Sequence, residues 1–169
     1  MYPADRFKTI LRFLLRKPII PLVWLILFPM HAVSQDCSVD QIKLQGIFGQ
    51  VSFEVFIAAT PKSREKGLMN ITDFPKRRAM LFVYPSSQRV FFWMKNTFIP
   101  LDILFADGQG EIVKIHHNAK PHDETLIDSG EDVKFVLEIN AGLAKSYGLN
   151  IGAKMLHPKI LQHANWKCK

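Results

Sequence analysis

The stretch VFFWMKNTFIPLDILF, residues 90–105, holds two apolar segments joined by a turn. Aromatic and branched residues fill both segments, as is typical of β-strands. The residues between them favour a turn, because Asn96 and Thr97 form local backbone hydrogen bonds and Pro100 restricts the returning chain. The stretch therefore predicts two neighbouring strands in the core of a β-rich protein.

Charged and amide side chains around this turn are the first candidates for a site. A charged group beside buried residues must be paired, hydrogen-bonded or in contact with a ligand. Asp102 lies between Leu101 and Ile103, and Glu138 has an equally apolar setting. We expect Lys95 and Asn96 to meet Asp102 at one end of the two strands, with Arg64 and Glu138 nearby.

The rest of the chain reads as short strands with a few helical turns. Residues 50–57 alternate between apolar and polar, which indicates a half-buried strand. Thr60 and Pro61 are typical of a helix start, and Asn140 is expected to cap a second helix at residues 143–147. Further strands are predicted at residues 80–84, 112–115, 133–139 and 154–156, and residues 116–132 are expected to form a long surface loop.

Several motifs resemble the DUF192 family, a domain of unknown function. They are TP, RE and GLM within residues 60–69, MLFVYP at 80–85, FWMKNT at 92–97, IPLDILF at 99–105 and VLEINAG at 136–142. The resemblance covers roughly residues 50–156, and the loop at 116–132 departs from it. It implies a fold and a set of suspect residues, but no reaction.

The predicted fold class is α+β, with a mainly antiparallel small open barrel or clam-like sheet and two short helices. The expected strands follow one another too closely for helical crossovers between parallel neighbours. With 169 residues the chain suits one domain, which we expect to be monomeric.

Residues 1–34 are predicted to be a signal peptide. Five basic residues precede a short apolar run, and Ala32 and Ser34 supply the small residues of a cleavage site. The alternative is an uncleaved anchor, although the run is short for a membrane span. We therefore expect residues 35–169 to be an exported domain, periplasmic or extracellular, with no stable membrane span after cleavage.

Both cysteines, Cys37 and Cys168, lie at the ends of this domain. In an exported protein an even number of cysteines suggests a disulfide, and two free thiols are the alternative. The leader carries a net charge of +4, so removing it reduces the chain's +7 to +3. That is an ordinary surface charge, and no nucleic-acid partner is expected.

The predicted ligand-binding residues are Arg64, Trp93, Lys95, Asn96, Asp102, Glu138 and Asn140. Structural roles remain open for three of them. Arg64 suits a helix surface, Trp93 suits the core, and Asp102 suits a contact with Lys95, Arg64 or the turn amides.

Catalytic and metal motifs give little support to an enzyme. The sequence has no G-x-S-x-G, C-x-x-C or H-E-x-x-H motif, and a metal held by His116, His122 and Asp123 would require the loop to fold back. We expect no cofactor. The favoured function is a non-catalytic binding or accessory module for a small molecule or envelope component, with a cleft near Trp93–Asp102. The alternative is a hydrolase of envelope carbohydrate that uses Asp102 and Glu138, so whether the protein is an enzyme stays open.

Overall fold

The computed structural model describes residues 38–162. The predicted signal peptide, Cys37 and Cys168 lie outside these residues. Within the described range, no helix is both long enough and apolar enough to cross a membrane.

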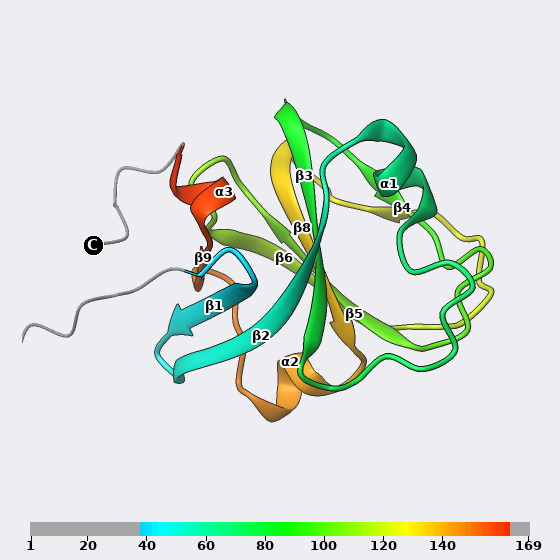
Figure 1. The fold of residues 1–169 in the computed structure, drawn as a ribbon, viewed down its shortest axis with the longest axis horizontal. Coiled ribbons are helices and arrows are strands. Elements are labelled where there is room, and N and C mark those ends of the chain that lie inside the picture. Colours follow the sequence, from blue (N-terminus) through cyan, green and yellow to red (C-terminus); the bar gives the residue numbers. More distant parts are fainter. Residues whose placement is uncertain (1–37, 163–169) are drawn as a thin grey trace, which may run out of the picture. The chain divides into compact units, whose positions relative to one another are not determined.

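Residues 38–162 form nine strands and three short helices (Figure 1). In chain order they are β1 (Gln41–Gly46), β2 (Gly49–Ala58), α1 (Pro61–Lys66), β3 (Arg78–Gln88), β4 (Phe91–Phe92), β5 (Leu101–Ala106), β6 (Ile112–Ala119), β7 (Ile127–Asp128), β8 (Val133–Asn140), α2 (Leu143–Ser146), β9 (Lys154–Leu156) and α3 (Pro158–Leu161).

Seven strands form one curled sheet in the order β6-β5-β8-β3-β2-β1-β9. Its neighbours are antiparallel except for β2 and β3, which run parallel. The predicted α+β barrel is thus confirmed in outline, but the sheet is mixed. The difference arises because residues 59–77, which include α1, are long enough to carry the chain back as the crossover that parallel strands need.

The two edges of the sheet meet at one end and partly close the barrel. The amide of Ile112 donates to the carbonyl of Ala153 at 2.8 Å, and that of Met155 donates to Gly110 at 2.7 Å. Gly110 permits this approach. Its φ is +78°, and an added Cβ would lie 2.9 Å from the Met155 carbonyl oxygen.

Both faces of the sheet are buried. One apolar cluster joins side chains from every strand of the curled sheet, with Leu81, Leu104 and Leu137 among them. A second cluster, which includes Phe82 and Phe105, lies on the opposite face and reaches β4 and the segment after α1. Because side chains alternate along a strand, neighbouring residues of β3, β5 and β8 enter different clusters.

Some local expectations were wrong. The strand predicted at residues 90–94 shortens to β4, which pairs with β7 rather than β5. Residues 116–132 are only partly loop, because β6 continues to Ala119 and β7 follows. Residues 158–161 form a third helix, although only two helices were expected. These errors share a cause, since each element is fixed by partners distant in the sequence.

Candidate functional site

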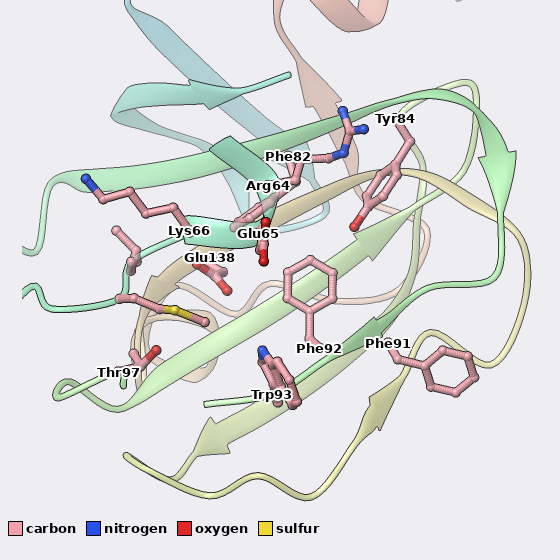
Figure 2. A pocket seen from close by; sticks show the side chains of 13 residues that line it. Arg64, Glu65, Lys66, Phe82, Tyr84, Phe91, Phe92, Trp93, Thr97 and Glu138 are labelled. Carbon is pink, nitrogen blue, oxygen red and sulfur yellow. The ribbon is translucent and has the colours of Figure 1, made fainter. Parts of the chain in front are cut away.

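A cavity of about 280 Å³ opens between α1, β3, β4 and β8. Five aromatic residues line it, and they are Phe82, Tyr84, Phe91, Phe92 and Trp93. Phe82 and Phe92 pack edge to face, with ring centroids 5.0 Å apart. In Figure 2 the Phe91 ring points away from the others, so the remaining rings form the walls. The size and apolar lining suit a small organic molecule.

Glu138 brings a carboxyl group into this apolar space. It lies in β8, opposite Met80 of β3 and Ile103 of β5. The residue is 5% exposed, and its Oε2 has no hydrogen-bond partner among the described residues. Burial raises the pKa of Glu138 to about 8, because the charged form loses its hydration. The side chain is therefore mainly protonated at neutral pH.

Arg64 fixes the wall of the cavity formed by α1. Its Nη1 donates to the carbonyls of Ala59 at 2.6 Å and Val83 at 3.0 Å, which ties α1 to β3. The guanidinium lies 5.0 Å from the centroid of the Tyr84 ring. A capping box at Thr60 and Ser63 sets where this helix begins. Arg64 thus lines the cavity and also has a structural role.

Tyr84 lies on the same face of the sheet as Glu138, since it follows Met80 and Phe82 in alternate positions of β3. Figure 2 shows its hydroxyl directed into the cavity rather than toward α1. Burial raises the pKa of Tyr84, the nearby Arg64 charge lowers it, and Glu138 raises it. The phenol is therefore a neutral donor at physiological pH, as is the protonated Glu138.

Trp93 borders the cavity next to β4. Its side chain is partly exposed at 43%, and the Lys95 ammonium lies 5.1 Å from the ring centroid. Thr97 is buried on the same side, and its hydroxyl donates to the Lys95 carbonyl at 3.3 Å. Lys95 therefore packs on the indole instead of pairing with Asp102.

Asp102 occupies the opposite face of the sheet. Its register partner is Ile139, so its side chain points away from the cavity that receives Glu138. The carboxylate accepts hydrogen bonds from the amides of Asn118 and Ala144, each at 2.9 Å. Ala144 lies in the first turn of α2, so Asp102 does the capping expected of Asn140. His117 lies 3.9 Å from the same carboxylate.

The predicted residues therefore separate into two groups. Arg64, Trp93 and Glu138 line one cavity. Lys95, Asn96, Asp102 and Asn140 do not. Asn96 adopts a φ of 53°, and its carbonyl oxygen accepts a hydrogen bond from the backbone amide of Asn70. The side-chain amide of Asn140 donates to the carbonyl oxygen of Phe74 at 2.8 Å. Among residues 38–162, no cluster of three His, Cys, Asp or Glu side chains is placed to hold a metal.

Comparison with known proteins agrees with the resemblance to the DUF192 family that the sequence motifs carry. The model of the DUF192 family, described as "Uncharacterized ACR", matches residues 44–157. This chain belongs to the DUF192 family.

Two solved structures are similar to this DUF192 protein. One, from Sinorhizobium meliloti 1021, is described as a candidate transcription regulator; it is 39% identical, with a TM-score of 0.69 over 70% of this chain and 93% of that one. The other, from Novosphingobium aromaticivorans DSM 12444, has unknown function; it is 35% identical, with a TM-score of 0.67 over 69% of this chain and 83% of that one. No curated protein matches the chain.

Sequence reasoning missed most of the other residues that line this cavity, among them Tyr84, Phe92 and Thr97. Tyr84 was assigned to a strand, but its face depends on the pairing of β3 with β8. The alternation of Met80, Phe82 and Tyr84 was a usable signal once that pairing was known.

The Asp102 contacts predict a structural role. Asp102→Asn replaces one acceptor oxygen with a donor facing a backbone amide, so we expect a loss of about 1.5–3 kcal/mol in the free energy of unfolding. Lys95→Met is the control, because losing an exposed cation–π contact costs less than about 1 kcal/mol. Urea denaturation measures both. Equal stability of Asp102→Asn and wild type would return Asp102 to the candidate ligand-binding residues.

The buried Glu138 predicts a pH-dependent stability. Between about pH 4.5 and pH 8 the folded state holds a proton that the unfolded state has released. The contribution of Glu138 to the free energy of unfolding should therefore fall as pH rises through this window, by at most ~1.4 kcal/mol per pH unit, and level off above it.

The test compares denaturation midpoints across that pH range. Glu138→Gln should remove this part of the pH dependence, whereas Glu124→Gln, at an exposed position between β6 and β7, should retain it. A Glu138→Gln protein with the wild-type pH profile would show that Glu138 is ionised in both states.

Proposed function

We propose that this DUF192 protein is an exported, non-catalytic binding module, acting as a monomer, whose ligand occupies the cavity at Glu138. The ligand is a small molecule or part of a larger envelope component. One observation carries the proposal: a carboxyl oxygen is buried in an aromatic cavity, and no residue of the described range 38–162 is its hydrogen-bond partner. Buried polar groups in folded proteins are nearly always satisfied, so this group is suited to a partner from outside the chain.

The separation of the two carboxylates favours binding over hydrolysis. A glycosidase of the kind considered above needs two carboxyl groups on either side of one bond. Glu138 opens into the cavity, whereas Asp102 points to the other face and is held by backbone amides. The hydrolase hypothesis based on this pair therefore has no support from the geometry.

Two features support the export part of the proposal. The sequence of residues 1–34 has the order of regions typical of a signal peptide. The proposed disulfide requires the first and last strands to be neighbours, and β1 does pair antiparallel with β9. The His157 ring also lies 3.0 Å from the Val39 carbonyl, which holds the start of the domain beside α3.

A ligand screen tests the binding function. Thermal-shift measurements on the purified protein should find at least one stabilising compound among sugars, peptidoglycan fragments, nucleotides, metal ions and small ring compounds. A ligand at a hundred times its Kd adds about 2.7 kcal/mol to the free energy of unfolding. Glu138→Leu and Trp93→Ala should abolish the shift, because they remove the unpaired carboxyl and the indole at the cavity.

His117→Ala is the matched control for this screen. His117 lines a separate depression beside Asp102, so the substitution should leave the shift intact. A shift lost in His117→Ala but kept in both cavity variants would place the ligand at the Asp102 face instead. Turnover of a glycan fragment by the wild type, lost in Glu138→Gln, would contradict the non-catalytic assignment.

The export proposal has its own test. Protein recovered from the envelope or medium should begin after Ser34, and its unreduced form should carry a Cys37–Cys168 disulfide. Amino-terminal sequencing and mass spectrometry after alkylation measure both. Protein that still begins at Met1 would contradict cleavage after Ser34. Protein that takes up two alkyl groups without reduction would contradict the disulfide.

A further inference from the structure

The cavity places two neutral donors on adjacent strands. Glu138 of β8 and Tyr84 of β3 both face it, and the phenol oxygen makes none of the hydrogen bonds recorded among residues 38–162. Neither side chain bonds the other, so each O–H group remains available to a ligand. A carboxylic acid that apolar surroundings keep neutral can donate a hydrogen bond in a protein site.

The charged groups around the cavity disfavour a cationic ligand. Of the elements that pack against Glu138, α1 presents Arg64, Glu65 and Lys66, so its cations outnumber its acid. Strand β5 presents only apolar Ile103 opposite Glu138. Beyond β4, the Lys95 ammonium already lies over the Trp93 ring. An incoming ammonium group would meet these cations, although the carboxyl group alone would attract it.

An anionic ligand is also poorly matched to the floor of the cavity. Arg64 and Lys66 both line the cavity, but the Nη1 of Arg64 is engaged with two backbone carbonyls. A carboxylate beside Glu138 would lose its hydration in this largely apolar cavity. A neutral acceptor avoids that cost, because it needs only the proton that Glu138 keeps.

We propose, building on the binding function above, that the cavity takes an uncharged ring compound whose carbonyl oxygen accepts a hydrogen bond from Glu138. The ring lies among Phe82, Phe92 and Trp93. The space is adequate, since an apolar cavity of about 150 Å³ holds benzene and this one measures about 280 Å³. A ring with a short carbonyl substituent therefore fits, whereas a long ligand must extend past Trp93.

Three probes of similar size separate the possible chemistries. Acetophenone presents a neutral carbonyl, α-methylbenzylamine replaces that oxygen with an ammonium group, and benzoate presents a carboxylate. In NMR titrations of the purified protein at about pH 6.5, acetophenone should bind about tenfold or more tightly than either ionic probe. The amine cannot accept a hydrogen bond from Glu138, and benzoate must lose the hydration of its charge.

The variants and pH assign the effect to Glu138. Glu138→Gln keeps a donor, so its affinity for acetophenone should stay within about threefold of wild type, whereas Glu138→Leu should lose about tenfold or more. Raising the pH to about 9, above the Glu138 pKa of about 8, should weaken wild-type binding about tenfold. Glu138→Gln should show no such pH dependence.

The outcomes distinguish this inference from the binding function itself. Tighter, Glu138-dependent binding of the amine or of benzoate would overturn the carbonyl assignment and leave the binding function standing. Acetophenone affinity that is unchanged by Glu138→Leu, or by the rise in pH, would overturn it as well. If no probe binds and the broad screen still gives a Glu138-dependent ligand without a carbonyl, only this inference fails; if neither gives a ligand, both fail.

Discussion

The register of β8 between β3 and β5 fixes the chemistry on both faces of the sheet. These central strands are buried on two sides, so a shift of one residue would exchange their entire side-chain sets. Phe135, Leu137 and Ile139 must enter one cluster, and Val136 must enter the other. The burial of these neighbours therefore determines on which face of the sheet the Glu138 side chain lies. It enters the second cluster, beneath α1 and β4.

The two carboxyl groups of the central strands show what this constraint implies. Asp102 and Glu138 lie on adjacent strands in equally apolar surroundings, yet their environments differ in hydrogen bonding. Asp102 receives two backbone amides, one of them from the first turn of α2, so its charge stabilises the end of the sheet. Among residues 38–162, no donor reaches Glu138 Oε2, and burial raises the pKa of this side chain above its usual range. One is part of the framework, and the other is available to a ligand.

Much of the local structure could be predicted from the sequence, because it depends on near neighbours. The alternation in β2, the Thr60–Pro61 helix start and the hairpin of β5 and β6 all follow from residues close in the chain. The parallel pairing of β2 with β3 and the pairing of β4 with β7 could not be derived in this way. They depend on crossovers and on burial against distant segments.

Because distant strand pairings could not be derived from the sequence, only some of the site residues could be identified. Glu138 and Trp93 stand out as a charge and an indole within apolar runs, so the sequence marks them as unusual. Whether Asp102 shares their cavity depends on a relation between faces, which only the pairing of β5 with β8 determines. Tyr84 escaped notice because a tyrosine in a strand is ordinary until its face is known. Individual residues were therefore easier to identify than the group they form.

The cost of Glu138 supports the view that its proton matters. At neutral pH the unfolded chain ionises this side chain and the folded chain does not, so its burial lowers the free energy of unfolding. A leucine would fill the same position without that cost. A carboxylate that accepts hydrogen bonds from backbone amides, as Asp102 does, would have its charge satisfied. Glu138 is neither apolar nor bonded in this way. A buried acid that is costly to the fold and open to an aromatic cavity is best explained by a contact that forms only when the cavity is occupied.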